Sequence, residues 1–360
     1  MRLVRTDSIK IGSVLGQTIY NEKGIPLIRQ GIRLTKAMIN RLHSLEIGFV
    51  YIDDDLTDGI VVEPTIPNEL KVEAISEIKS LFNKISMADL SNRSYILTEE
   101  NDKLTNIIKD IINELNYKDD TLSMLADMFV ADTYTFQHSL NVALYSITLG
   151  KKLNFNQRQL NELALGAVLH DIGKVFIDDK ILQKPGQLTD KEFKIMQAHT
   201  ELGFNFLREN TDLPSIIAHC AYQHHERLDG SGYPRQLKGE DIHLYAQIIG
   251  IADVFDAVTS DRIYRNALLP HQGLEILYAD AVYKFDRRLV ELFKRSIVVY
   301  PNGMTVKLND NRLGIVAKQN KSICDRPVIR IIKEEDEDVT PYNLDLSKEH
   351  NLMIEECFML

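Results

Sequence analysis

The spacing of hydrophobic positions predicts a long helical centre between two smaller segments. Apolar residues recur every three or four positions through most of the middle of the chain, which is typical of amphipathic and buried helices. The runs that follow this pattern cover residues 67–117, 122–153, 157–170, 191–209, 214–227, 244–259 and 271–283. We therefore expect an all-α bundle at the centre, with residues 63–118 as a helical connector that leads into it.

Both ends of the chain show shorter, β-like patterns. Residues 18–20 and 25–28 flank a turn sequence that ends in glycine, and Thr35 can cap a helix that precedes a strand at residues 49–52. These signals predict a small α+β module over residues 1–62, with a regulatory or interaction role.

Near the C-terminus, β-like runs at residues 304–308, 313–318 and 328–332 predict a small β domain over residues 297–360. The acidic run at residues 333–338 is expected to be a solvated loop. The expected architecture is thus multi-domain and mainly α, with a central all-α bundle between a small α+β module and a small β domain.

The charge balance of the 360-residue chain excludes some classes of binding partner. With 52 acidic against 42 basic side chains, the net charge of −10 argues against a general nucleic-acid or membrane-surface binder. Three cysteines without paired metal spacing indicate a reducing compartment, and no apolar run is long enough for a membrane span. We therefore expect a soluble, cytoplasmic protein.

The first candidate chemistry lies at residues 163–174, which read L-A-L-G-A-V-L-H-D-I-G-K. Helix neighbours point about 100° apart, so His170 and Asp171 can face one cavity and still bind different metal ions. Gly173 is expected to let the backbone turn out of the helix. An isolated His-Asp pair is more often a capped helix end with a surface histidine. The rest of the chain favours a metal site.

Further imidazoles and carboxylates stand at or near the ends of predicted helices in the same region. Together with the His-Asp pair they give seven candidate ligands: His138, His170, Asp171, His199, His224, His225 and Asp253. Seven ligands suffice for two metal ions if Asp171 bridges them, and positions then stay open for water and substrate. Mixed imidazole and carboxylate ligation favours iron, manganese or another first-row ion over calcium. His219 and His243 are expected to be structural.

These residues and their flanks resemble the HD-GYP family, a branch of the HD metal-dependent phosphohydrolases whose members hydrolyse the bacterial second messenger cyclic di-GMP. The match rests on H-D-I-G-K at 170–174, K-P-G-Q-L-T at 184–189, H-H-E-R-L-D-G-S-G-Y-P at 224–234 and D-R-I-Y-R at 261–265. It covers roughly residues 119–296, which we expect to be an HD-type catalytic domain. The tail that begins Y-P-N-G-M-T-V resembles extensions found on some family members.

The resemblance implies a phosphodiesterase that converts cyclic di-GMP to pGpG, and whether GMP is a further product is left open. The nucleophile would be a hydroxide that bridges two divalent ions, Fe or Mn. One ion would be held by His138, His170, Asp171 and Asp253, and the other by Asp171, His199, His224 and His225. Catalytic roles fall to Asp171 and Lys174. Substrate-binding roles fall to Lys174, Arg262, Arg265, Gly232, Tyr233 and Pro234.

Family members with a third metal carry a glutamate four residues before the first histidine, where this chain has Tyr134. A phenol with an ordinary pKa of about 10 is a poor replacement for a carboxylate, and Asp132 lies on a different part of the helix. We therefore predict a two-metal site, with pGpG as a major product. Asp256, one turn after Asp253, is expected to orient a ligand or a water.

Two alternatives to the phosphodiesterase stay open. One is a cyclic dinucleotide receptor that keeps its metals but turns over too slowly to matter. The other is another HD-type nucleotide phosphohydrolase, against which the extended motif at residues 224–234 argues. The G-Y-P loop and the N-terminal module are the candidate surfaces for a protein partner, and the oligomeric state, a dimer included, is left open.

Overall fold

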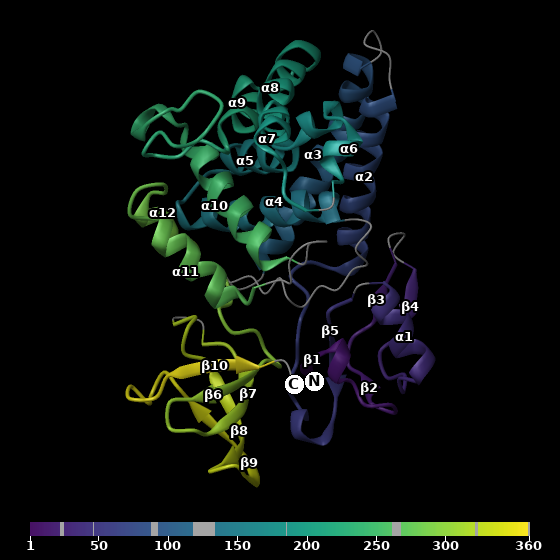
Figure 1. The fold of residues 1–360 in the computed structure, drawn as a ribbon, viewed down its shortest axis with the longest axis vertical. Coiled ribbons are helices and arrows are strands. Elements are labelled where there is room, and N and C mark those ends of the chain that lie inside the picture. The colour runs from purple at the N-terminus through teal and green to yellow at the C-terminus, as the bar shows by residue number, and fades with distance from the viewer. Residues whose placement is uncertain are drawn as a thin grey trace. The chain divides into compact units, whose positions relative to one another are not determined.

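The computed structural model describes residues 1–21, 25–45, 47–87, 93–117, 134–184, 186–260, 268–320 and 323–358. These residues form two compact units. The first unit is built from both ends of the chain, essentially residues 1–68 and 297–358, and the second from residues 69–117 and 135–296 (Figure 1). The predicted architecture, mainly α with a small N-terminal α+β part and a small C-terminal sheet, is confirmed.

The N-terminal part of the first unit is a small sheet with one helix. Strands β1 (Arg2–Arg5), β5 (Phe49–Asp53) and β2 (Val14–Leu15) form an antiparallel sheet in the order β1-β5-β2. The predicted hairpin is present as β3 (Ile19–Tyr20) and β4 (Pro26–Ile28). Helix α1 (Lys36–Ser44) begins after Thr35, whose hydroxyl accepts from the Met38 N–H at 3.3 Å, as expected for an N-cap.

The C-terminal part of the first unit is a five-stranded antiparallel sheet in the order β10-β6-β7-β8-β9 (Figure 1). Its strands are β6 (Thr305–Leu308), β7 (Leu313–Lys318), β8 (Val328–Glu334), β9 (Glu337–Asp345) and β10 (Ile354–Phe358). The acidic run expected to be a loop is instead a tight hairpin. Glu335 and Asp336 adopt positive φ angles of 48° and 66°, which suits a two-residue turn between β8 and β9.

The two ends of the chain pack together within the first unit. Ile60 shares an apolar cluster with Ile315 and Ile332, and the Leu3 N–H donates to the Gly303 carbonyl at 2.8 Å. The Arg330 guanidinium also donates to the Asp58 carbonyl. The first unit is therefore held together by contacts between segments that lie more than 200 residues apart in the sequence.

The second unit is helical. Its helices are α2 (Asn68–Met87), α3 (Arg93–Tyr117), α4 (Tyr134–Lys152), α5 (Gln157–Leu169), α6 (Asp179–Leu182), α7 (Asp190–Gln197), α8 (His199–Asn210), α9 (Ser215–Gln223), α10 (Leu244–Thr259), α11 (Pro270–Asp280) and α12 (Arg287–Lys294). The run expected at residues 191–209 is two helices that meet at Ala198. None of the helices in the described part of the chain is both long and apolar enough to span a bilayer.

The core of the second unit lies between α4, α10 and α12. Residues 138–150 of α4 are all buried, and the rings of Tyr145, Phe255 and Phe293 meet edge to face with centroids 5.1 to 5.6 Å apart. Such aromatic pairs stabilise beyond their buried area. The packing holds α4 and α10 side by side, and each of these helices carries one of the candidate ligands.

Candidate metal centre

The structure brings the seven predicted ligands into one place in the second unit. His138 comes from α4 and Asp253 from α10, and the other five stand at helix ends or between helices. His170 ends α5, Asp171 begins the 3₁₀ helix η5 (Ile172–Phe176), and His199 begins α8. The pair at residues 224–225 directly follows α9. Six of the seven are buried, and His225 is partly exposed.

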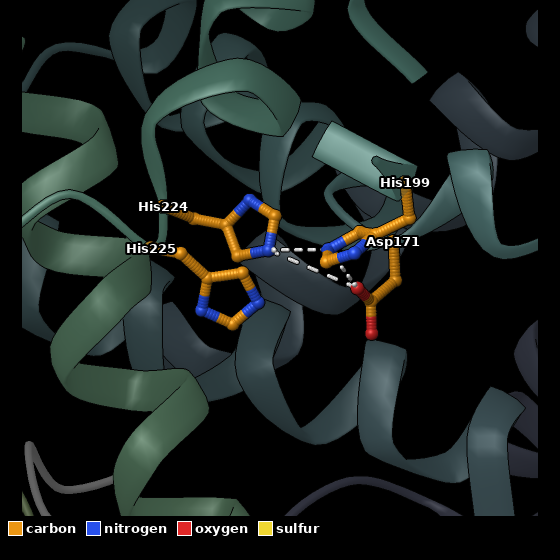
Figure 2. A group of neighbouring side chains, drawn as sticks. All are labelled: Asp171, His199, His224 and His225. Atoms are coloured by element: carbon orange, nitrogen blue, oxygen red, sulfur yellow. Dashed lines mark hydrogen bonds and ion pairs between the residues drawn. The ribbon is translucent and has the colours of Figure 1, made fainter. Parts of the chain in front are cut away.

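Asp171 lies between two groups of imidazoles. Its Oδ1 is 3.4 Å from His199 Nε2 and 3.8 Å from His224 Nε2, as Figure 2 shows. Its Oδ2 lies on the other side, 3.3 Å from His170 Nε2 and 3.9 Å from His138 Nε2. Each oxygen of one carboxylate therefore faces a separate set of nitrogens, which is the arrangement that a carboxylate bridge between two metal ions needs.

The other carboxylate of the centre is Asp253. Its Oδ1 lies 3.1 Å from His138 Nε2 and its Oδ2 lies 3.8 Å from His225 Nδ1. The ligand atoms form two groups with all distances below 4.8 Å, one made of Asp171, His199, His224 and His225 and the other of His138, His170 and Asp171. The grouping agrees with the division between two ions that the family resemblance implies, except that Asp253, which the resemblance gives to the first ion, is in neither group. The roles of the seven residues as ligands stay a prediction.

Three of the histidines are oriented by the same local contact. Each Nδ1 lies within hydrogen-bond distance of the carbonyl three residues earlier: His170 with Ala167 at 2.6 Å, His199 with Met196 at 2.7 Å, and His224 with Ala221 at 3.0 Å. A carbonyl can only accept, so Nδ1 is the protonated nitrogen in each ring. The lone pair of Nε2 is then free to bind a metal ion at the centre.

Within the part of the chain that the structure describes, His170 Nε2 and Asp171 Oδ1 are buried at the centre and have no hydrogen-bond partner. Buried polar atoms are rarely left unpaired, because the loss of water is then not compensated. A divalent cation would satisfy both a nitrogen lone pair and a carboxylate oxygen, so the residues present fit metal binding. This fit agrees with the divalent metals bound by HD-domain phosphohydrolases.

The electrostatics of the centre also suit metal binding. Burial lowers the pKa of His224 and His225 well below the usual 6.5, so both rings are neutral at pH 7. Burial opposes ionisation of Asp171, but the pKa of this carboxyl is held well below its usual range, with the Lys174 ammonium as the largest lowering cause. Neutral imidazoles and an ionised carboxylate are the forms that bind metals.

Asp256 orients His138. Its Oδ2 is 2.7 Å from His138 Nδ1, and its Oδ1 accepts from Asn141 Nδ2 at 2.8 Å. Although burial opposes protonation of His138, its contacts with Asp253 and Asp256 outweigh that effect and raise its pKa to about 9, so a metal ion that binds Nε2 must displace a proton there. The sequence indicated an orienting role for Asp256 but gave no signal for Asn141, which stands one turn after His138 and donates to Asp256.

The G-Y-P loop lies against the histidine pair. The Tyr233 N–H donates to the His225 carbonyl at 3.2 Å, and its ring packs 4.6 Å from the His225 ring. A Cβ at Gly232 would stand 2.4 Å from the His225 carbonyl oxygen, so only glycine fits there. Sequence reasoning missed Glu226, whose buried carboxylate accepts from the backbone N–H groups of Arg235 at 2.7 Å and Leu237 at 2.9 Å.

Gly173 has a different role from the one expected. It lies within η5, and its φ is not left-handed, so it is not needed for a turn out of a helix. A Cβ at this position would stand 1.8 Å from the His199 carbonyl oxygen and 2.6 Å from the Gly203 amide nitrogen. The glycine is therefore required because α8 crosses η5 at close range, which brings His199 beside Asp171.

The remaining predicted residues divide into two sets. Lys174 lies at the edge of the centre with its Nζ 2.5 Å from Asp171 Oδ2, and its side chain is 27% exposed. Arg262 and Arg265, as well as Asp132, fall outside the residues that the structure describes. Tyr134 begins α4, but its side chain lies outside the described part of the chain, so the prediction about a third metal is not tested.

A family model described as "HD domain" matches residues 86–289, which is more than half of the chain. The chain belongs to the HD domain family. A second model, "KOW domain associated with HD domain", matches residues 305–359. The family predicted from the sequence motifs is thus confirmed.

Several curated proteins resemble this HD domain protein. It is 34% identical over 215 residues to the "Cyclic di-GMP phosphodiesterase PA4108" of Pseudomonas aeruginosa, covering 59% of this chain and 52% of that protein. A "Cyclic di-GMP phosphodiesterase" of Thermotoga maritima is 37% identical over 233 residues, covering 61% and 60%. The "3'3'-cGAMP-specific phosphodiesterase 2" of Vibrio cholerae is 38% identical over 198 residues, covering 54% and 37%.

The chain therefore spans between about a third and three fifths of the length of these relatives. Among solved structures, the HDG"Y"P protein Bd1817 from Bdellovibrio bacteriovorus matches with a TM-score of 0.50 at 15% identity, over 81% of this chain and 97% of that one. At this identity the match supports the HD-type fold alone.

Proposed function

We propose that this HD domain protein is a metal-dependent phosphodiesterase that hydrolyses cyclic di-GMP to pGpG. The observation that carries the proposal is the pair of ligand groups on either side of Asp171, with Nε2 atoms that face the carboxylate oxygens. The proposal is supported by the curated relatives, two of which are named cyclic di-GMP phosphodiesterases.

His138, His170, Asp171 and Asp253 would hold one divalent ion, and Asp171, His199, His224 and His225 the other, with iron or manganese as the preferred metals. When bound, such a pair supplies Lewis acidity at the phosphoryl oxygens and lowers the pKa of a water to near neutrality. The protein need not supply a nucleophile of its own.

The chain's own residues bind and orient the substrate. The Lys174 ammonium lies beside Asp171 at the partly exposed edge of the centre, where it can bind a phosphoryl oxygen or the leaving oxygen. Arg262 and Arg265 are proposed to hold the second phosphate or stack on guanine. Gly232, Tyr233 and Pro234 would line the same site, because their loop packs on the His225 ring.

The test is a product time course. The full chain, loaded anaerobically with Mn²⁺ or Fe²⁺, is incubated with cyclic di-GMP and the products are separated by chromatography. Formation of pGpG supports the proposal, and the later appearance of GMP would show that a chain with Tyr134 still makes the second cut. Intact substrate with protein of verified metal content would contradict the proposal, and tight binding without turnover would indicate a receptor.

A second candidate substrate is 3'3'-cGAMP, because one relative at 38% identity is named as specific for it. The same time course with both cyclic dinucleotides at equal concentration compares their kcat/KM values. Asp171→Ala should abolish turnover of either substrate, because the bridging carboxylate is lost from both ligand groups.

The organisation of the whole chain is part of the proposal. Residues 119–296 would be the catalytic domain, 63–118 its helical connector, and 1–62 and 297–360 accessory domains. Residues 1–62 and the G-Y-P loop are the proposed surfaces for a protein partner, with dimerisation as one possible outcome. A cytoplasmic location is supported by the sequence, whose three cysteines show neither paired metal spacing nor the density of a disulfide framework.

A further inference from the structure

A series of aromatic rings leads from the metal centre to the surface of the second unit. The Tyr233 ring lies 4.6 Å from the His225 ring and 6.4 Å from the His199 ring, measured between centroids. The Phe193 ring, on α7, lies 6.2 Å from the Tyr233 ring in an edge-to-face arrangement. One aromatic ring therefore separates Phe193 from the imidazoles of the centre.

Phe193 lies at the exposed end of this series. It is 47% exposed, whereas Tyr233 is largely covered. A single exposed apolar residue needs no explanation by itself. Here, however, the exposed ring borders a site whose proposed substrate carries two purine bases, and its edge-to-face contact with Tyr233 leaves ring surface open to a ligand.

The backbone that carries Phe193 is held firmly. A capping box closes the start of α7, in which the Glu192 carboxylate accepts from the Thr189 N–H at 2.7 Å. The same carboxylate binds Lys184 Nζ at 2.6 Å. The Phe193 N–H donates to the Thr189 carbonyl at 2.8 Å. Lys184, Thr189 and Glu192 thus fix the first turn of α7, which places Phe193 at the rim of the centre.

We propose that Phe193, supported by Tyr233, is a stacking platform for a purine base of the dinucleotide substrate. The inference rests on the proposed phosphodiesterase function and names how that site recognises a base. A nucleotide separates its base from its phosphate by one ribose, so a phosphate at the metal centre leaves a base within reach of the rim. Stacking uses the π-face that every base has, so Phe193 accepts guanine and adenine alike.

The kinetic test compares Phe193→Ala with Ile195→Ala, a matched control on the same helix with the same exposure of 47%. Loss of a stacked base should raise KM by about 5- to 150-fold. Stacking is present both in the bound substrate and in the transition state, so kcat should change little. Metal content and melting temperature should equal those of the wild type, which separates lost stacking from a structural effect.

A spectroscopic test uses the absence of tryptophan from the chain. Phe193→Trp introduces a single tryptophan, whose fluorescence should be quenched when pGpG or cyclic di-GMP stacks on it. Ile195→Trp should show little change in the same titration.

Two results would overturn the stacking role while leaving the proposed function intact. One is a wild-type KM in Phe193→Ala. The other is unchanged fluorescence of Phe193→Trp while calorimetry shows that the ligand binds. Failure of the metal-loaded wild type to bind or cleave any cyclic dinucleotide would instead remove the proposed function, and the stacking role with it.

Discussion

Replacement of Asp256 should weaken one of the two proposed metal sites and affect the other less. The side chain is almost fully buried, and both of its oxygens are used, one by His138 Nδ1 at 2.7 Å and one by Asn141 Nδ2 at 2.8 Å. Carboxylates that orient a metal-binding histidine typically contribute 10- to 100-fold to metal affinity. Two substitutions at this position separate the contribution of the carboxylate charge from that of the hydrogen bond to His138.

Asp256→Asn keeps one acceptor for His138 but removes the charge. Among the described residues, Asn141 Oδ1 is buried and has no hydrogen-bond partner. If the Asn141 amide flips, this oxygen can accept from the new N–H₂ group of the asparagine at position 256. A neutral hydrogen bond is roughly half as strong as a charge-assisted one, so we expect a loss near the lower limit, about tenfold or 1.4 kcal/mol. Asp256→Ala leaves His138 without its partner and should approach about 100-fold.

The assay is an anaerobic titration of the full chain with Mn²⁺, in which calorimetry measures the heat of binding. Of the two binding steps, the one assigned to His138 and His170 should weaken, while the step assigned to His199 and His224 should change less. Asp286→Asn is the control, since this residue caps α12, is not a candidate ligand, and can be replaced in that cap by asparagine. Wild-type affinities for both ions in both Asp256 variants would refute the orientation of His138 by Asp256.

Three further predictions concern the supports of the centre. Gly173→Ala should destabilise the second unit by at least about 3 kcal/mol in chemical denaturation, because its Cβ would overlap backbone atoms at 1.8 Å, whereas Gly203→Ala, with its nearest atom at 3.1 Å, should cost far less. Equal losses would contradict the close helix crossing. Glu226→Ala removes the acceptor of the partly buried backbone N–H groups of Arg235 and Leu237, just after the G-Y-P loop. The amide exchange of these two groups should accelerate by about tenfold, and unchanged rates would refute the role of this carboxylate. The Lys184 ammonium, followed by the contacts with the Thr189 N–H and hydroxyl, lowers the Glu192 pKa from 4.5 to about 2. The ionised carboxylate should therefore protect the α7 amides from exchange fully above pH 4.5 and progressively less toward pH 2. If the difference in α7 amide exchange between the wild type and Glu192→Gln did not shrink over that range, the role of this carboxylate would be contradicted.

The sequence was sufficient for the elements with long apolar patterns. Helix α10 begins and ends where the pattern placed it, at Leu244 and Thr259, because 11 of its 16 residues are buried. Helix α12 was missed, since eight residues give too short a pattern to separate helix from strand. Only the packing of Phe293 on α4 and α10 makes its position evident.

Strand β9 was missed for a different reason. It is one of the two edge strands of its sheet, carries Pro341, and is mostly exposed, so its sequence lacks the apolar alternation of a half-buried strand. Its pairing with β8 follows from the turn at Glu335 and Asp336 rather than from its own composition. Likewise, nothing local in the sequence marks Asn141 or Glu226, since their partners lie 115 and about ten residues away.

The histidines could be found from sequence because helix termination and ligand orientation are here the same event. The last carbonyls of a helix have no intrahelical partner and need a donor. In α5, α7 and α9 a carbonyl of the last turn receives the Nδ1–H of the histidine that follows, at His170, His199 and His224. That contact satisfies the helix end, sets the tautomer and turns Nε2 toward Asp171. A helical run that stops at histidine can therefore specify both the end of the helix and the direction in which the ligand atom points. It indicates a metal site when several such helix ends converge, as the ends of α5, α7 and α9 do.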